Sequence, residues 1–297
     1  MIVAIVVTFN PAENIQYLLD RTSEQVDEIV VVDNGSSDQV CIAKTTSSDK
    51  EIHYILNAEN RGLSTALNQG IKKALELGAL HLLLLDQDTS LGENMVAMLI
   101  RDEQELLAQG EKVGVVGPRL IDVQSGKHIP FVRSEGFHRV RSSCSQKAKS
   151  IADHVITSGS LININVIHDV GLMWEPLFVD YIDVEWCHRA RSKGYKVYGS
   201  AVAEMQHDIG EKRHAIPFTS RQIPIHSAFR VFYLVRNLIW VSRLPYFTRF
   251  WGISEFFRIV AKISVEALFH NERFARIKAL KSGLWHGMTN FPKDKMY

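Results

Sequence analysis

Short runs of apolar residues, each ending in a polar tip, recur through the first third of the chain. Three of them are IVAIVV (2–7), EIVVVDNGSSD (28–38) and LLLLDQDTS (82–90). Continuous apolar runs of roughly four to eight residues are typical of strands that are covered on both faces of a sheet. The pattern therefore predicts buried strands at these positions and a further strand, IHYILN, at residues 52–57.

Segments with helical spacing of apolar residues separate these strands. Residues 12–25 form the first such segment, and residues 60–78 read as a loop that enters a second helix. Strands that alternate with helices are joined by right-handed crossovers and give a mainly parallel sheet flanked by helices. The expected fold class is therefore α/β.

Several elements are expected in the second half of the chain. The pattern predicts strands at 113–120 and 196–207, and a long loop in the polar stretch at 122–150, which lacks a clear period. Residues 154–171 are predicted to contain a strand, a small-residue turn, a second strand and a short helix. An apolar strand is expected to begin at residue 177 and to continue into a helix.

Length and composition limit the class of protein. The 297 residues allow one large α/β domain with an appendage, and arginine with many aromatic residues dominates after about residue 225. We therefore divide the chain into an α/β domain at 1–225 and a helical C-terminal region at 226–297. The content of 46% apolar and 23% charged residues is typical of a globular protein, and a net charge of +1 gives no global field for nucleic acid.

Cysteine spacing and hydropathy exclude further classes. The three cysteines lie far apart without CxxC spacing, which argues against a disulfide framework or a zinc site and fits a reducing cytosol. The first residues, MIVAIVVTFNP, lack the basic region and cleavage site of a signal peptide. Since no stretch reaches the ~18 apolar residues of a spanning helix, we expect a protein that is not integral to a membrane.

Polar side chains follow the predicted strands of the first domain. They are Thr8, Asn10, Asp33, Asn60, Asp86 and Asp88. The carboxyl ends of parallel strands meet at one edge of a sheet, where ligands bind. Residues two apart on an extended chain point the same way, so Asp86 and Asp88 could address one cation or diphosphate. The alternative is a solvated strand end that starts a turn with Thr89 and Ser90.

A set of short motifs occurs in a fixed order over roughly residues 1–245. The motifs are VVTFN, VVDNGSSD, NRG, DQD, TSGS, DYIDVEW, HDIG and YLVRN. In order and spacing this set resembles the family 2 glycosyltransferases, which have the GT-A fold that binds nucleotide-diphospho-sugars. LLLLDQDT, FVDYIDVEW and the late RN look most like bacterial rhamnosyltransferases that use dTDP-L-rhamnose. The resemblance implies an enzyme that transfers a sugar with inversion at the anomeric carbon.

The resemblance also implies a divalent cation, Mg²⁺ or Mn²⁺, that stabilises the leaving diphosphate. Both ions prefer oxygen ligands and take one or two carboxylates. In the family the second aspartate of the pair, here Asp88, usually binds the metal, while the first, here Asp86, often reaches the donor ribose or a water. His207 matches a histidine that completes the metal shell; the alternative is a buried histidine that hydrogen-bonds to the backbone.

Other motif residues are expected to contact the donor. Asp33 falls where the family binds the nucleobase, and a carboxylate suits the imide N–H of thymine or uracil. The alternative for Asp33 is an Asx turn in DNGSSD, and both readings can hold together. Small residues in TSGS would let the backbone pass close to the donor sugar. The further donor contacts implied by the motifs are Thr8, Asn10, Asn60, Arg61, Ser158 and Gly159.

Inverting transfer requires a base that takes the proton of the acceptor hydroxyl, and a carboxylate within hydrogen-bond reach is sufficient. Alignment through Arg189 places Asp183 on the family's base. The family usually has Glu-Asp-x-Asp here, whereas this chain has Ile182 and Glu185 at the flanking acid positions. Asp180 and Glu185 therefore remain rivals to Asp183.

Two arginines of AFRVFYLVRNLIW, Arg230 and Arg236, share one face of a predicted helix. Arginine forks suit phosphate oxygens, so we expect contacts to the diphosphate or to the acceptor. The alternative is a core or lipid-facing helix whose arginines extend along apolar surface.

The last part of the chain combines positive charge with aromatic residues. Residues 244–297 contain nine Lys or Arg and four Asp or Glu, a net charge of +5. In residues 250–263 the aromatic residues Phe250, Trp251, Phe256 and Phe257 alternate with basic ones at helical intervals, which is typical of a helix lying on anionic lipid. The alternative is a helix packed on its own domain or on a second copy of the chain.

The resemblance, together with the basic and aromatic C-terminal region, implies a metal-dependent transferase on the cytoplasmic face of the bacterial membrane. Its expected donor is dTDP-L-rhamnose, and its expected acceptor is a lipid-linked oligosaccharide of a surface polysaccharide such as O-antigen. The alternatives are a related transferase with a UDP-sugar donor and a non-catalytic protein that binds nucleotide sugars.

Overall fold

The computed structural model divides the chain into two compact units. The first comprises Met1–Glu175 and Ile182–Asp208, and the second comprises Pro176–Tyr181 and Ile209–Met296. The boundary at residue 225 that composition suggests stays a prediction. The residues that the structure describes are 1–11, 15–38, 50–123, 126–135, 138–142, 149–207, 213–215, 222–224, 227–269 and 273–292.

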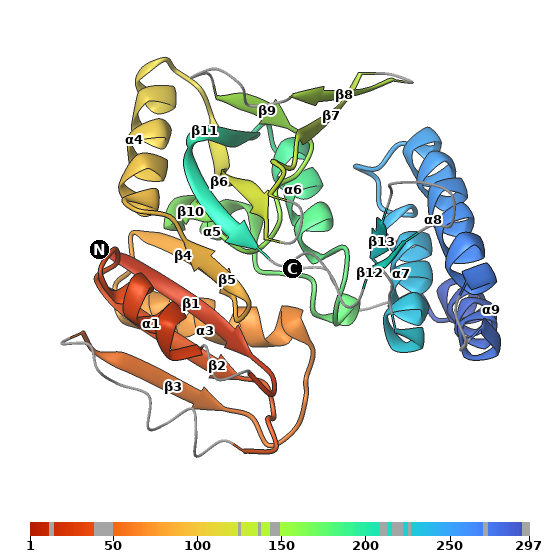
Figure 1. Cartoon of the computed structure of the whole chain (residues 1–297). Coiled ribbons are helices and arrows are strands. Elements are labelled where there is room, and N and C mark those ends of the chain that lie inside the picture. Colours follow the sequence, from red (N-terminus) through yellow and green to blue (C-terminus); the bar gives the residue numbers. More distant parts are fainter. Residues whose placement is uncertain are drawn as a thin grey trace. The chain divides into compact units, whose positions relative to one another are not determined.

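The described residues of the first unit form a mixed sheet of nine strands (Figure 1). The strands are β1 (Ile2–Thr8), β2 (Glu28–Asp33), β3 (Ile52–Leu56), β4 (His81–Asp86), β5 (Thr89–Leu91), β6 (Val113–Asp122), β9 (Ser150–Ala152), β10 (Leu161–Asn163) and β11 (Lys196–His207). Their order is β3-β2-β1-β4-β10-β6-β11-β5, and β9 pairs with β11. β3, β2, β1 and β4 run parallel, as do β6 and β11, whereas β5, β9 and β10 run antiparallel to their partners.

Helices bury this sheet on both faces, which explains the uninterrupted leucine run. Leu83 and Leu85 belong to a core cluster that contains side chains of α1 and α4. Leu82 and Leu84 alternate to the opposite face and are also buried. On α3, a Cβ added to Gly70 would lie 2.3 Å from the Ile5 side chain, so this helix lies directly on β1. The helices of this unit are α1 (Ile15–Ser23), α3 (Leu63–Glu76), α4 (Met95–Ala108), α5 (Ile164–Val170) and α6 (Ile182–Ser192).

The predicted α/β class is therefore confirmed, and three local predictions are wrong. The strand expected at the start of residues 154–171 does not form, because the described backbone there has no strand before β10 (Leu161–Asn163). The stretch at 122–150 is not one long loop, because β7 (Phe131–Glu135) and β8 (His138–Ser142) pair as an antiparallel hairpin and β9 joins the main sheet. Burial of Phe131 against Gly199 holds β7 in place, a contact across 68 residues that local periodicity does not contain.

The strand expected to begin at residue 177 is also absent from the described chain. A short 3₁₀ turn, Glu175–Leu177, occurs there instead, and Phe178, Asp180 and Tyr181 have positive φ angles of 66°, 61° and 66°. Left-handed backbone cannot continue a strand, so the apolar run ends as a strained loop.

The second unit is mainly helical in its described residues. It contains α7 (Ala228–Val241), α8 (Arg249–Phe269), α9 (Arg273–Thr289) and a ladder of β12 (Arg213–Ala215) and β13 (Gln222–Pro224). α7 and α9 approach closely through glycines of α9, because a Cβ added to Gly283 would lie 2.7 Å from the Phe232 carbonyl oxygen. None of the helices in the described part of the chain combines the length and the hydropathy needed to cross a bilayer.

Candidate active site

Strand register brings the polar tips of the first unit to one edge of the sheet. Thr8 pairs with Asp33 between β1 and β2, and Val7 pairs with Asp86 between β1 and β4. The end of β11 lies between β5 and β6, because His207 pairs with Thr89 of β5 and with Asp122 of β6. The backbone of His207 thus lies opposite the residue that follows Asp88; its side chain is outside what the structure describes.

Asp33 is the centre of a buried hydrogen-bond network. Its carboxylate accepts bonds from Thr8 Oγ1 (3.1 Å), from the Ser36 backbone N–H (3.0 Å) and from the Ser36 hydroxyl. The Ser36 hydroxyl in turn accepts the Asn10 backbone N–H at 2.7 Å. Asp33 thus closes a local turn in DNGSSD, although its bond reaches the backbone three residues on, one residue further than in an Asx turn. Since Asp33 is 0% exposed, a nucleobase would reach it only after the Ser36 turn shifts, and the nucleobase role stays a prediction.

Asn10 shapes the same corner from the loop after β1. Its φ angle is 46°, and its side-chain oxygen accepts the Ser37 backbone N–H at 3.0 Å and the Ser37 hydroxyl at 2.9 Å. The two loops after β1 and β2 are thus joined by side chains, not by backbone pairing alone. Asparagine tolerates the left-handed region because its short polar side chain bonds locally.

The loop that enters α3 is fixed by a second asparagine network. Asn60 Oδ1 accepts bonds from Asn34 Nδ2 and from the Gly62 backbone N–H, each at 3.0 Å. Asn34 Oδ1 accepts the Arg61 backbone N–H at 3.0 Å. Asn60 therefore orders this loop, while the Arg61 side chain is exposed at its surface. Sequence reasoning missed Asn34, although its position directly after Asp33 in DNGSSD was a usable signal.

The turn that carries Asp86 and Asp88 is held on three sides. The Asp86 backbone N–H donates to Ser158 Oγ at 3.0 Å, and Thr89 Oγ1 donates to the Asp86 carbonyl at 2.7 Å. Gln87, between the two aspartates, exchanges hydrogen bonds of 2.7 and 3.2 Å with the backbone of Phe9. The side chain of Gln87 thus anchors the turn, a role that the sequence analysis did not assign.

Gly159 lets the TSGS turn lie against β4. Its backbone N–H donates to the Leu84 carbonyl at 2.7 Å, and its φ angle is 81°. A Cβ at this position would lie 2.5 Å from Pro118 Cγ. Only glycine fits both the left-handed backbone and this close approach. The TSGS turn therefore belongs to the same edge as Asp86.

The aspartate pair offers a donor set that suits a divalent cation. Asp86 is half-buried and Asp88 is exposed at the carboxyl edge. Over the residues that the structure describes, no three His, Cys, Asp or Glu side chains form a cluster that could hold a metal ion. Mg²⁺ does not require such a cluster, because it commonly uses one or two carboxylates together with water and substrate phosphates. The residues present fit that mode of binding.

The acids at the start of α6 have different environments. Glu185 is 0% exposed, and its two oxygens accept Arg189 Nε and Nη2, each at 2.9 Å. Arg189 also donates to the carbonyls of Val170 (2.9 Å) and Leu172 (2.8 Å). This buried pair ties α6 to the end of α5. Asp183, in contrast, is partly exposed in the first turn of α6, and its Oδ1 accepts the Val184 N–H at 2.8 Å.

In the second unit, α7 holds the strained loop at 176–181. Asn237, which is 0% exposed, donates from its amide to the carbonyls of Leu177 (2.8 Å), Val179 (2.7 Å) and Asp180 (3.0 Å). Backbone strain of this kind costs about 1–3 kcal/mol per residue and persists only where the surroundings enforce it. These amide bonds provide that enforcement. The sequence analysis missed this role of Asn237.

The two arginines of α7 contact the same loop. Arg230 pairs with Asp180, with Nη2 at 2.5 Å from Oδ1. Arg236 donates from Nη2 to the carbonyls of Pro176 (2.7 Å) and Leu177 (3.0 Å), and burial lowers the pKa of its guanidinium to about 10. The alternative of a packed helix thus accounts for the contacts of Arg236, while the phosphate role of both arginines stays a prediction.

A sequence profile described as "Glycosyl transferase family 2" matches residues 3–170, more than half of the chain. The chain belongs to glycosyl transferase family 2. This family 2 protein is 30% identical over 245 residues to the dTDP-rhamnosyl transferase RfbF of Shigella flexneri, covering 82% of this chain and 80% of the relative. It is 27% identical over 215 residues to the low-salt glycan biosynthesis hexosyltransferase Agl10 of Haloferax volcanii, covering 69% of this chain and 66% of the relative.

Solved structures agree on the fold of this family 2 enzyme. GalNAc-T7 with UDP, GalNAc and Mn²⁺ has a TM-score of 0.58 at 13% identity, covering 98% of this chain and 58% of that one. S. aureus TarS 1–349 in complex with UDP-GlcNAc has a TM-score of 0.52 at 14% identity, covering 99% of this chain and 93% of that one. The predicted GT-A fold and glycosyltransferase class are confirmed.

Proposed function

We propose that this family 2 enzyme transfers L-rhamnose from dTDP-L-rhamnose to a lipid-linked oligosaccharide of a surface polysaccharide such as O-antigen, with inversion at the anomeric carbon. The observation that carries the proposal is the 30% identity with the dTDP-rhamnosyl transferase RfbF over 82% of the chain. The alternative donor is a UDP-sugar, because two structural neighbours contain UDP or UDP-GlcNAc, but at 13–14% identity they show the fold alone.

In this proposal the edge of β1, β2 and β4 binds the donor. The Asp33 corner, with Thr8 and Asn10, receives the nucleobase, and the loop with Asn60 and Arg61 borders the ribose and phosphate. The position of these residues at the carboxyl ends of adjacent parallel strands supports this placement. Arg230 and Arg236 are proposed to add phosphate contacts.

Asp86 and Asp88 are the residues that would hold Mg²⁺ or Mn²⁺, with His207 as a further ligand. When bound, the cation would neutralise charge on the diphosphate as it leaves. The residues themselves contribute a fixed geometry, since Ser158, Gln87 and Thr89 bond the turn on which the two carboxylates lie. A non-catalytic protein that binds nucleotide sugars would be favoured if acids were missing at the metal and base positions, but both positions carry acids.

Asp183 is proposed as the base that takes the proton of the acceptor hydroxyl while that oxygen attacks the anomeric carbon. Its partial exposure supports this role, because a base must reach the substrate. The rivals are less suitable. The carboxylate of Glu185 is buried against Arg189, and that of Asp180 is paired with Arg230.

The C-terminal helices are proposed to contact the inner face of the bacterial membrane, where a lipid-linked acceptor is found. On α8, Phe250, Ile253 and Phe257 are 42%, 57% and 66% exposed at helical spacings of three and four. Trp251, which we expected as an anchor, instead packs on Phe247 with ring centroids 4.6 Å apart. The exposed face is the better candidate for lipid contact.

A similar apolar stripe runs along α9. Phe274 and Trp285 are 76% and 65% exposed, and Ile277 and Met288 continue the stripe at spacings of three residues from each. The exposed basic residues beside the two stripes are Arg249, Arg258, Arg273, Lys278 and Lys281. Apolar anchors among basic residues match an anionic bilayer surface; contact with a second copy of the chain is the competing proposal.

Donor hydrolysis tests the proposed function without knowledge of the acceptor. The enzyme is incubated separately with dTDP-L-rhamnose, UDP-glucose, UDP-galactose and UDP-GlcNAc, each with Mg²⁺, with Mn²⁺ or with EDTA. We expect slow release of dTDP that requires the cation. Release of UDP alone would show that the donor is a UDP-sugar. Equal release in EDTA would contradict the requirement for a divalent cation.

A further inference from the structure

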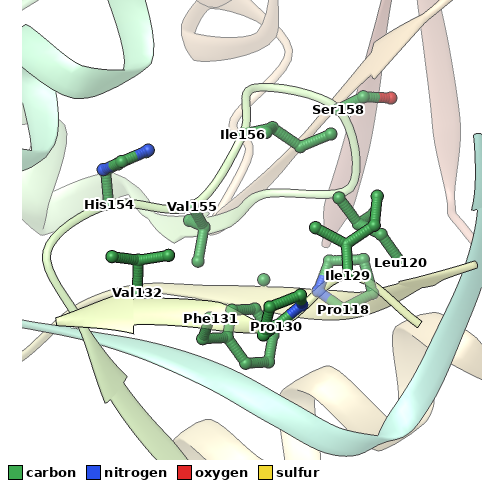
Figure 2. Close-up of a pocket in the computed structure, with 11 residues that line it drawn as sticks. Pro118, Leu120, Ile129, Pro130, Phe131, Val132, His154, Val155, Ile156 and Ser158 are labelled. Carbon is green, nitrogen blue, oxygen red and sulfur yellow. The ribbon is translucent and has the colours of Figure 1, made fainter. Parts of the chain in front are cut away.

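A pocket of about 160 Å³ lies in the first unit beside the TSGS turn (Figure 2). Its walls come from β6, from the start of β7 and from the segment before TSGS. The apolar residues that form most of the lining are Pro118, Leu120, Ile129, Phe131, Val155 and Ile156. Two side chains with polar groups, His154 and Ser158, also line the pocket.

Ser158 connects this pocket to the proposed donor edge. It lines the pocket, and its Oγ accepts the backbone N–H of Asp86 at 3.0 Å. In Figure 2 the Ser158 oxygen points away from the apolar side chains of the pocket. The next residue, Gly159, lies against Pro118 and donates to the Leu84 carbonyl. One turn therefore separates the apolar pocket from the strand that ends in Asp86.

An apolar pocket at this place is unexpected for a site that binds an ordinary hexose. A hydroxyl that enters such a pocket loses its bonds to water, and an unpaired buried hydroxyl is unfavourable. A 6-deoxyhexose differs, because C6 carries no hydroxyl and presents a methyl group. The methyl is the one group of such a sugar that gains from apolar surroundings.

We propose that this pocket receives the C6 methyl of a 6-deoxyhexose donor, and that Leu120, Val155 and Ile156 determine specificity for the deoxy sugar. The inference rests on the proposed function and deepens it, since L-rhamnose is 6-deoxy-L-mannose. The occupant is a substituent of the donor, because the pocket borders the Asp86 turn and shares Ser158 with it.

The expected discrimination follows from the chemistry of such pockets. A single methylene or hydroxyl difference in a hydrophobic pocket changes kcat/KM by roughly 10- to 200-fold. We expect the wild-type enzyme to prefer dTDP-L-rhamnose over dTDP-L-mannose by about 10- to 100-fold in donor hydrolysis. The two donors differ only in the C6 hydroxyl, so their ratio isolates the pocket.

The test is to measure this ratio for the full chain and for Val155→Thr, which adds a hydroxyl at nearly constant volume. Leu120→Asn is a second variant in case Val155→Thr fails to fold, as judged by its melting curve. Val113→Thr is the matched control, because Val113 is a buried valine of β6 that does not line the pocket. We expect the rhamnose preference to fall about tenfold in the pocket variants and to stay unchanged in the control.

The outcomes separate the two claims. A wild-type ratio of dTDP-L-rhamnose to dTDP-L-mannose hydrolysis near one, or a ratio that is unchanged in a folded pocket variant, overturns the inference about the pocket. In either case turnover of dTDP-L-rhamnose would still support the proposed function. A wild-type preference for dTDP-L-mannose also overturns it and would indicate that His154 bonds the C6 hydroxyl. If neither dTDP donor reacts and a UDP donor does, the proposed function fails and this inference fails with it.

Discussion

Replacing Glu185 by glutamine tests whether this acid is structural or catalytic. In the wild type both carboxylate oxygens accept guanidinium N–H groups of Arg189 at 2.9 Å, and both side chains are buried. Glutamine keeps the shape and one acceptor oxygen, but it turns an amide NH₂ toward a guanidinium NH₂. The buried guanidinium of Arg189 then loses the counter-charge that Glu185 supplies.

The structure gives the expected magnitude. Removing one partner of a buried ion pair costs about 3–5 kcal/mol, and the acceptor that glutamine keeps places this variant near 3 kcal/mol. Urea unfolding followed by tryptophan fluorescence measures the change. With a slope of about 3 kcal/mol per molar urea, the midpoint falls by about 1 M. Turnover of the variant that remains folded should stay within a few-fold of wild type.

Asp183→Asn is the matched comparison, because Asp183 lies two residues before Glu185 in the same helix. Asp183 is partly exposed at the helix N-terminus, so the loss of its charge there costs about 0.3–1 kcal/mol. Its transfer rate should fall by about two to four orders of magnitude, since the base is lost, while donor affinity is unchanged. A Glu185→Gln enzyme with wild-type stability and no turnover would refute this reasoning and move the base to Glu185.

Three further predictions concern other parts of the chain. Asn237→Leu removes two amide N–H groups, which bond the carbonyls of the loop at 176–181, and an amide oxygen, which accepts two N–H groups of Arg236. At about 1 kcal/mol for each of these four N–H groups, the variant should lower the free energy of unfolding by about 4 kcal/mol. The exposed Asn165→Leu should change it by less than about 0.5 kcal/mol, and equal urea midpoints for the two variants would contradict the role of Asn237. Asp88→Asn should lose most donor hydrolysis, and the remainder should no longer respond to added Mn²⁺; a metal response like that of wild type would exclude Asp88 as a ligand. Co-sedimentation with anionic liposomes should weaken as the salt concentration rises. It should be lost in a triple variant in which the exposed apolar residues of α8 are replaced by serine, with Tyr17→Ser, an exposed aromatic residue of the first unit, as the control. Binding retained by the triple variant would show that another part of the chain contacts the lipid. The residues of that triple variant are Phe250, Ile253 and Phe257.

The parallel part of the sheet was predictable because its signal is local. The apolar runs of β1, β2 and β4 are buried on both faces, and burial on both faces produces a run that sequence alone reveals, whereas β3, at the sheet edge, is only partly buried. The hairpin of β7 and β8, and the three-residue β5 that pairs with β11, depend on contacts between distant residues. Their short alternation carries too little periodicity to distinguish them from loops.

The candidate site shows the same division. The motif order identified the acids, but it could not rank Asp180, Asp183 and Glu185, because the ranking depends on what each carboxylate contacts. One signal was present in the sequence: Arg189 follows Glu185 by four residues, the spacing of a helical ion pair. The pairing of Asp180 with Arg230, across 50 residues, had no such signal.

A donor competition decides whether L-rhamnose is the sugar that this enzyme transfers. The enzyme is given an equimolar mixture of dTDP-L-rhamnose, UDP-glucose, UDP-galactose and UDP-GlcNAc with Mn²⁺, and free dTDP and UDP are measured over one time course. We expect dTDP to accumulate first and Asp88→Asn to lose most of this release. Faster accumulation of UDP, lost in the same variant, would show a family 2 transferase with a different donor and would contradict the assignment of L-rhamnose.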